Sequence, residues 1–204
     1  MPDELGRRVV HASGATVPGA YLLDQHVLST GLITWRVVQG VAVFGLVLAA
    51  VLEAARLSGT IEHPIYDTLT REYEQDKVAG YALYVVSGTV VVLAFAPPIA
   101  VPSLLMLMLG DPVSGILSTG ELRTVKRPRV LVGMFVVSVA FAYPFMWTVT
   151  GNPVLGGVAA VAGAAGATVA DGVKPTIRDY VIDDNLTIPI AAAVAMQAVL
   201  LLVA

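Results

Sequence analysis

The chain alternates between long apolar runs and short polar segments. Seven apolar runs can be drawn, and each is close to the ~20 residues that a helix needs to cross the hydrocarbon core of a bilayer. They cover residues 12–30, 35–55, 79–96, 99–117, 130–149, 154–171 and 186–204. The first run is the weakest, because Pro18 and Asp24 interrupt it. We therefore expect an all-α fold, a polytopic transmembrane bundle of about seven spans that forms one domain over residues 1–204.

Composition supports this class of protein. Of the 204 residues, 56% are hydrophobic and only 13% are charged, and the mean hydropathy is +0.79. The absence of cysteine excludes disulfides, thiolate catalysis and cysteine-ligated metals. Run 154–171 is rich in alanine and glycine, which let helices approach closely in lipid, so we expect it to be an inner helix. Pro112 and Pro189 are expected to break the runs that contain them.

Charge is distributed unevenly along this pattern. When the polar segments are assigned alternately to the two membrane surfaces, every lysine and arginine except Arg36 lies on the side of the N-terminus. The positive-inside rule makes that side cytoplasmic. Every acid except Asp24 lies on or near the same side, although the rule does not concern acids. A site at the cytoplasmic face that binds metal and phosphate would explain their position.

Two acidic positions stand out. Asp111 follows Gly110 near the end of an apolar run, and residues 183–185, Asp-Asp-Asn, precede the last run. A charge at membrane depth is costly and marks a candidate functional site. Because Mg²⁺ prefers carboxylate and phosphate oxygens, Asp111 and Asp184 are candidate metal ligands, with Asn185 as a further ligand. The alternative is that Asp184 or Asn185 caps the last helix.

Basic side chains lie near the same surface. Arg7 and Arg8 are about one helical turn from His11, so one of them can share a face with it. Guanidinium groups suit phosphate because they bind it in a bidentate way and stay charged. Further along, Lys126 and Arg127 lie in a strongly basic segment. The alternative for both groups is an ordinary cytoplasmic anchor, attracted to anionic lipid.

Two more arginines are candidates for phosphate binding. Arg56 lies three residues after Glu53, a spacing that equally allows an ion pair within the helix. Arg71 lies in the longest polar segment, residues 57–78, close to Glu74.

Several common nucleotide and metal motifs are absent from the sequence. No GxxxxGK[ST] phosphate loop and no HExxH zinc motif is present. Asp171-Gly172 does not continue into the pattern of a CDP-alcohol phosphotransferase.

A set of short motifs, in the same order along the chain, resembles the dolichol kinase/phytol kinase family of polyprenol kinases. The CTP-dependent diacylglycerol kinases of fungi look like the same group. The stretches are Arg7-Arg8-x-x-His11, Glu53-x-x-Arg56-Leu57, Arg71-x-Tyr73-Glu74, Gly110-Asp111-Pro112-Val113-Ser114-Gly115, Lys126-Arg127-Pro128 and Asp183-Asp184-Asn185-Leu186-Thr187-Ile188-Pro189. This sequence departs from the family in having Arg8 in place of lysine, and Gly120-Glu121 in place of a Gly-Lys pair.

The resemblance implies a membrane enzyme that transfers the γ-phosphoryl group of CTP to a lipid alcohol with the help of a divalent metal. Asp111 and Asp184 would hold Mg²⁺. Nucleotide and phosphate would contact a set drawn from the motifs: Arg7, Arg8, His11, Arg56, Arg71, Gly110, Lys126, Arg127 and Asn185. The base that takes the hydroxyl proton is left open among Asp183, Asp171 and Glu74.

The expected partners are a lipid alcohol from the bilayer, a nucleoside triphosphate and membrane lipids, with no nucleic acid. Two other groups of functions stay open from the sequence. One is a diacylglycerol-like lipid kinase or a cytidylyltransferase that makes a CDP-lipid. The other is a transporter or assembly subunit, although transporters place their charged site near the midplane, whereas here the acids crowd one surface.

Overall fold

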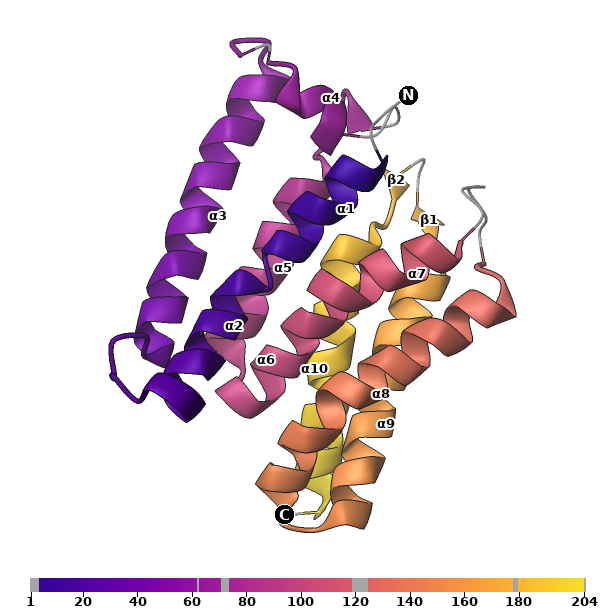
Figure 1. The fold of residues 1–204 in the computed structure, drawn as a ribbon. Helices are drawn as coiled ribbons and strands as arrows, with labels where there is room; N and C mark the ends of the chain where they lie inside the picture. Colours follow the sequence, from indigo (N-terminus) through magenta and orange to yellow (C-terminus); the bar gives the residue numbers. More distant parts are fainter. Residues whose placement is uncertain (1–3, 62, 71–73, 119–124, 178–179, 204) are drawn as a thin grey trace.

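The computed structural model describes residues 4–61, 63–70, 74–118, 125–177 and 180–203 (Figure 1). Most of this part of the chain is helical, as expected. The helices are α1 (Glu4–Ser13), α2 (Thr16–Leu23), η1 (Asp24–Leu28), α3 (Trp35–Leu57), α4 (Ile65–Leu69), α5 (Gly80–Ala94), α6 (Pro97–Leu105), η3 (Met106–Gly110), α7 (Asp111–Leu117), α8 (Pro128–Thr150), α9 (Pro153–Gly172) and α10 (Asp184–Val203). Two short antiparallel strands, β1 (Thr176–Ile177) and β2 (Tyr180–Val181), were not expected.

Within the described residues, five helices are long and apolar enough to cross a membrane. They cover Trp35–Leu57, Pro97–Leu117, Pro128–Thr150, Pro153–Gly172 and Asp184–Leu202, and the second of them combines α6, η3 and α7. Two of the seven expected runs do not form a single helix of spanning length. Run 79–96 contains α5, which is only 15 residues long, and the first run is divided between α1, α2 and η1.

Local sequence explains where the long helices begin and end. Asn152 caps α9, because its Oδ1 accepts from the N–H groups of Val154 and Leu155 at 2.9 and 3.2 Å. Gly151 ends α8 at a φ of +61°, a left-handed conformation that glycine adopts at little cost. Pro97 opens α6, where its missing N–H has no helical partner to lose.

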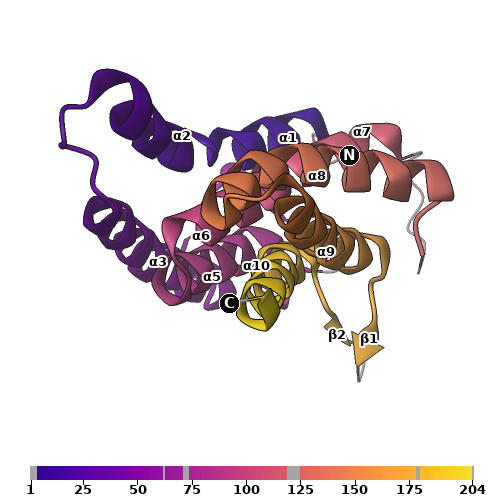
Figure 2. The ribbon, with the colours of Figure 1, turned by 90° about the horizontal axis from the view of Figure 1, so that it is seen from below.

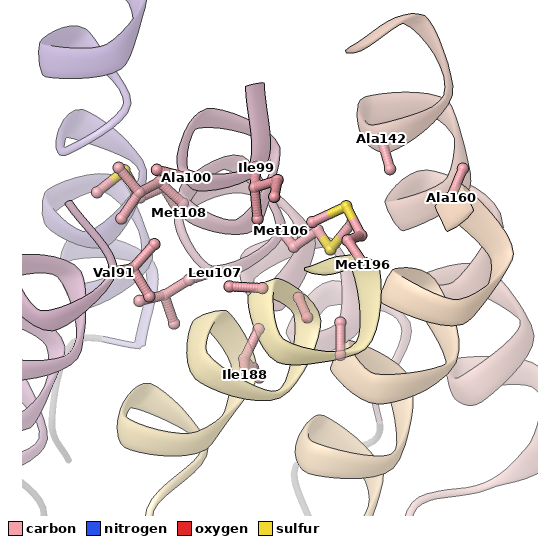
Figure 3. Packing of buried hydrophobic residues seen from close by; sticks show 14 of the residues in the cluster. Val91, Ile99, Ala100, Met106, Leu107, Met108, Ala142, Ala160, Ile188 and Met196 are labelled. Atoms are coloured by element: carbon pink, nitrogen blue, oxygen red, sulfur yellow. The ribbon is translucent and has the colours of Figure 1, made fainter. Parts of the chain in front are cut away.

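The centre of the bundle is formed by the α6–η3–α7 run and α10. Figure 2 shows α10 and α6 near the middle of the molecule, with α3 at one edge and α8 and α9 toward the other. Met106 and Leu107 of η3 are fully buried, as are Ile188 and Met196 of α10, and they pack in one apolar cluster (Figure 3).

Close packing of α9 against its neighbours follows from its small residues. A Cβ at Gly166 would lie 2.7 Å from the Ala191 carbonyl oxygen, and one at Gly156 would lie 2.7 Å from the Trp147 backbone, so α9 touches α10 and α8 closely. Its other face is exposed, and 33% of the span is buried, the same share as for Asp184–Leu202, against 67% for Pro97–Leu117. Run 154–171 therefore packs closely against α8 and α10, as its small residues indicated, and among the long helices described residues 97–117 form the most buried span.

The proline at position 112 does not break the chain as expected. The helix continues through it, because η3 is a π-helical segment in which the N–H of Asp111 donates to the carbonyl of Met106. Pro189 likewise lies inside α10. The first irregularity is a widened turn directly before Asp111, the type of distortion that often occurs at functional sites.

One end of the bundle gathers the polar parts of the chain. Figure 1 places α4, the N-terminus, the β1–β2 hairpin and the end of α7 at this end, whereas the C-terminus and the segment between η1 and α3 lie at the other. Asp24 and Arg36, the two exceptions in the charge pattern, belong to that other end.

Candidate functional site

Three carboxylates from three different helices converge at the polar end of the bundle. Asp111 is the first residue of α7, Asp171 lies in the last turn of α9, and Asp184 is the first residue of α10. One oxygen of each lies within 4.8 Å of the others. Asp171 and Asp184 are buried, whereas the Asp111 side chain is 22% exposed. The expectation that Asp111 and Asp184 come together is therefore confirmed, and Asp171 joins them.

The ammonium group of Lys126 lies among these carboxylates. Its Nζ is 2.6 Å from Asp171 Oδ1, and it is 4.0 Å from both Asp111 Oδ1 and Asp184 Oδ2. The backbone holds the lysine there, because the N–H of Lys126 donates to the carbonyl of Gly172 at 3.0 Å. A cation of the chain thus occupies the point where the three acids meet.

Two further side chains complete the group. Lys174 Nζ lies 2.6 Å from Asp184 Oδ2. The hydroxyl of Ser114, one turn after Asp111 on α7, donates to Asp171 Oδ2 at 2.7 Å and accepts from Lys126 at 3.0 Å. Among the described residues, the ammonium groups of Lys126 and Lys174 thus lie against the three carboxylates, as expected where like charges are brought close together and attract cations.

Helix α1 lies along the η3–α7 run and brings two predicted residues to it. Arg8 donates to the Gly115 carbonyl at 3.0 Å. The Nε2–H of His11 donates to the Leu107 carbonyl at 3.0 Å, and Nε2 is 3.8 Å from Asp111 Oδ2. In π-helical geometry the Leu107 carbonyl would accept from residue 112, but Pro112 has no N–H. His11 supplies the missing donor and so lies beside Asp111.

Arg56 has a structural position in the described part of the chain. It forms a bidentate ion pair with Glu53, at 2.9 and 2.7 Å, and donates to the carbonyls of Gln75 and Lys77. Glu53 also accepts from the N–H of Ala79 at 2.7 Å. These contacts fasten the segment before α5 to the end of α3, so the ion-pair alternative describes Arg56 here.

Residues 183–185 have three different structural positions. Asp183 caps α10, because its Oδ1 accepts from the backbone N–H of Asn185 at 2.9 Å and from its Nδ2 at 2.6 Å. The residue that caps α10 is therefore Asp183, whereas the alternative drawn from the sequence named Asp184 or Asn185. Asp184 belongs to the three-carboxylate group. The Oδ1 of Asn185 is buried and has no hydrogen-bond partner among the residues that the structure describes.

The base candidates Glu74 and Asp183 lie together at the start of α5. Both are buried, and a Cβ at Gly80 would lie 3.3 Å from Glu74 Oε1, 3.6 Å from Asp183 Oδ1 and 2.8 Å from Asn185 Nδ2. This second polar group is next to Asp184 in sequence but is not part of the three-carboxylate group.

The remaining predicted residues are placed as follows. A Cβ at Gly110 would lie 3.1 Å from Met134 Sδ, so this glycine allows close packing of η3 on α8. Arg127 is the N-cap residue of α8 and half-buried, and Arg7 is half-buried on α1. Arg71 lies outside the described residues.

Sequence reasoning missed Lys174 and Ser114, and it named Asp171 only as a possible base. Asp171 carried the same signal as Asp111, an acid at the end of an apolar run. Lys174 follows three residues later and carried no signal beyond its charge.

The donor set suits a hard divalent cation. Carboxylate oxygens are the ligands that Mg²⁺ takes in proteins, usually alongside water and substrate phosphates. The position of the Lys126 ammonium shows that the geometry accepts positive charge. The residues that would hold the ion are Asp111, Asp171 and Asp184, and Lys126 and Lys174 lie beside them.

These features define the class of protein: an integral membrane helical bundle with an acidic site at one end. A scan against protein-family models and searches of curated proteins and of solved structures each found no match. The resemblance to polyprenol kinases therefore rests on the sequence motifs.

Proposed function

We propose that this chain is a membrane lipid-alcohol kinase that transfers the γ-phosphoryl group of CTP to an isoprenoid alcohol of the polyprenol or dolichol type. The observation that carries the proposal is the meeting of Asp111, Asp171 and Asp184 around Lys126, with Lys174 alongside. Two of these acids and Lys126 belong to the motifs that resemble the family. The oxygen of the alcohol forms a bond to the γ-phosphorus, the bond to the bridging oxygen breaks, CDP leaves, and the hydroxyl proton is released.

We assign each side chain of the site a role in this reaction. Asp111, Asp171 and Asp184 hold Mg²⁺, which when bound neutralises charge on the terminal phosphates. Lys126 and Lys174 meet phosphate oxygens, and Arg7, Arg8 and Arg127 add positive charge at the same end. Because an oxygen of Asp171 lies within 4.8 Å of oxygens of Asp111 and Asp184, we assign it to the cation and not to the hydroxyl proton. Phosphoryl transfer depends mainly on positioning and charge neutralisation, so this set is sufficient in kind.

Orientation follows from the charge pattern. We propose that the N-terminus and the acidic site face the cytoplasm, because the cations gather at that end. Counting α5 and the α1–α2 pair with the five long helices gives the proposed seven crossings. The nucleotide arrives from water at this face, and the alcohol arrives from the bilayer.

A direct test incubates the purified protein in lipid nanodiscs with each nucleoside triphosphate, labelled at the terminal phosphate, and a panel of lipid alcohols. The proposal expects label to pass from CTP to an isoprenoid alcohol, with Mg²⁺ required. Label that stays in the nucleotide with every alcohol in the panel contradicts it.

The second candidate function is a cytidylyltransferase that makes a CDP-lipid from a lipid phosphate. The same carboxylates and lysines suit it, because it also handles a metal-bound triphosphate. The products separate the two functions: a kinase releases CDP, whereas a cytidylyltransferase releases pyrophosphate.

A further inference from the structure

A hollow lies between α3, α4 and α5, away from the carboxylate group. It has a volume of about 530 Å³, within the range of small-molecule sites, which is roughly 300–1,000 Å³. Its walls are almost wholly apolar, and they include Leu48 and Leu52 of α3, Ile65 and Leu69 of α4, and Val85 of α5. We infer that this hollow holds the hydrocarbon chain of the alcohol that accepts the phosphoryl group. The inference rests on the proposed function in naming that lipid as the acceptor.

The hollow is part of the surface that meets the bilayer. Only 17% of the α3 span is buried, and Phe44, Val47 and Val51 beside the hollow are all exposed. Leu48, which lines the hollow, is itself 47% exposed. In a membrane, hydrocarbon chains can fill an apolar space on such a face, because contact between apolar walls and water is unfavourable.

The position of α4 favours a specific lipid over bulk lipid. Figure 1 shows α4 at the polar end of the molecule, between the end of α3 and α1. Ile65, Tyr66 and Leu69 of this helix line the hollow, so the hollow extends to the end of the bundle where a lipid head group lies. A chain held there places its hydroxyl at the same end of the bundle as Asp111.

The first turns of α5 connect the hollow with the acidic site. Tyr81 lines the hollow, and its hydroxyl donates to Glu53. On another face of the same helix, Tyr84 donates to the carbonyl of His11 at 3.1 Å, and His11 lies beside Asp111. Only the start of α5 therefore separates the hydroxyl group of a lipid alcohol in the hollow from the acidic site, and a helix is about 10 Å across.

Two glycines of α3 provide a matched pair of variants. Gly45 lines the hollow, and a Cβ there would lie 3.8 Å from Val85 Cγ1, an ordinary contact, so a larger side chain extends into the space. Gly40 is exposed on the same helix, and a Cβ there would meet nothing within 4 Å. Gly45→Phe and Gly40→Phe change helix propensity equally, and the first of them fills the hollow.

The test uses an isoprenoid alcohol with a photoactivatable group in its chain, added to protein in phosphatidylcholine nanodiscs. Mass spectrometry locates the cross-links, and turnover is not needed. We expect label on α3, α4 and α5, competed by unlabelled isoprenoid alcohol but not by extra phospholipid. Gly45→Phe should lower labelling and raise the KM for the alcohol about tenfold, the effect of losing ~1.4 kcal/mol of binding, whereas Gly40→Phe should change neither.

The outcomes separate the two proposals. Labelling that phospholipid competes equally, or that Gly45→Phe leaves unchanged, overturns the inference by showing a bulk-lipid contact. Phosphorylation of alcohols with an unchanged KM in Gly45→Phe also overturns it and leaves the proposed function intact. Specific labelling without transfer to any alcohol overturns the proposed function and keeps the hollow as an isoprenoid site.

Discussion

Lys126 Nζ lies 2.6 Å from Asp171 Oδ1, across a sequence separation of 45 residues. This contact sets the charge of the site, because the same ammonium group is within 4.0 Å of Asp111 and Asp184. The lysine stands where a metal cation would be attracted. A divalent ion bound here would compete with the ammonium group for the three carboxylates, and a lysine displaced from them would be available to a phosphate.

The first prediction concerns this competition. Lys126→Met removes the cation but keeps the side-chain bulk, and it leaves Asp111, Asp171 and Asp184 to repel one another. Without divalent ions we expect a loss of about 3–5 kcal/mol in the free energy of unfolding, the range for breaking a buried ion pair. Mg²⁺ should restore much of it. Thermal unfolding in detergent with and without Mg²⁺ measures both effects.

The control is Arg129→Gln, which removes an exposed cation from the same segment and should change neither quantity. Equal stability and equal Mg²⁺ response in Lys126→Met and the parent would show that the ammonium does not balance these carboxylates.

The second prediction concerns His11 and Pro112. His11→Ala removes the donor to the Leu107 carbonyl and should cost about 1–3 kcal/mol, the range for a buried polar group left without a partner. Pro112→Ala returns a backbone N–H that this carbonyl can accept from. The penalty of His11→Ala should therefore shrink in the Pro112→Ala background. Unfolding of the four proteins in a double-mutant cycle gives the coupling energy, and strict additivity contradicts this account of the widened turn.

The third prediction concerns the close approach of α9 to its neighbours. Gly166→Ala places a methyl group 2.7 Å from the Ala191 carbonyl oxygen, which should destabilise the bundle by about 1–3 kcal/mol. Gly157→Ala is the matched change on the same helix, where the new Cβ lies 3.8 Å from the Tyr143 ring. It should stabilise by about 0.5–1 kcal/mol through helix propensity. Similar unfolding temperatures for the two variants would show that α9 and α10 do not pack this closely.

The fourth prediction concerns pH and the end opposite the site. The hydroxyl of Thr30 donates to Asp24, and this bond lowers the pKa of the carboxyl group against the opposing effect of burial. The N–H groups of Ile33 and Thr30 add to the lowering. A lowered pKa stabilises the fold above the unfolded-state value of about 3.9, and the stabilisation disappears as the pH falls through the folded-state pKa.

Asp24→Asn should therefore lower the unfolding temperature at pH 7, and the difference from the parent should narrow below about pH 4. The comparison is made by thermal unfolding across pH in detergent. A constant difference across that range would show that the charge of Asp24 is not what holds the segment between η1 and α3.

The spans were predictable because their signals are local. Apolar length marks the long helices, and residues such as Pro97 and Asn152 mark their ends. The burial of each span was not predictable, because helices in lipid are apolar on every face. Small residues in 154–171 indicated close packing correctly, but they did not indicate that one face of α9 is exposed.

The site was predictable in part for a similar reason. Asp111 and Asp184 are costly charges at the ends of apolar runs, and this cost marks them without any tertiary information. The pairing of Lys126 with Asp171 depends on how α9 packs and on the backbone bond from Lys126 to Gly172, which no local pattern encodes. The widened turn before Asp111 was missed because Pro112 indicates an interruption without specifying its form.

We propose above that Asp111, Asp171 and Asp184 together support phosphoryl transfer. The most direct measurement compares the parent protein, Asp171→Asn and Asp76→Asn, an exposed control, for transfer of the terminal phosphate of labelled CTP to an isoprenoid alcohol with Mg²⁺. We expect the parent and Asp76→Asn to label the alcohol, and Asp171→Asn to lose about 100-fold or more of this transfer activity while it remains folded. Full activity in a folded Asp171→Asn protein would contradict this proposal.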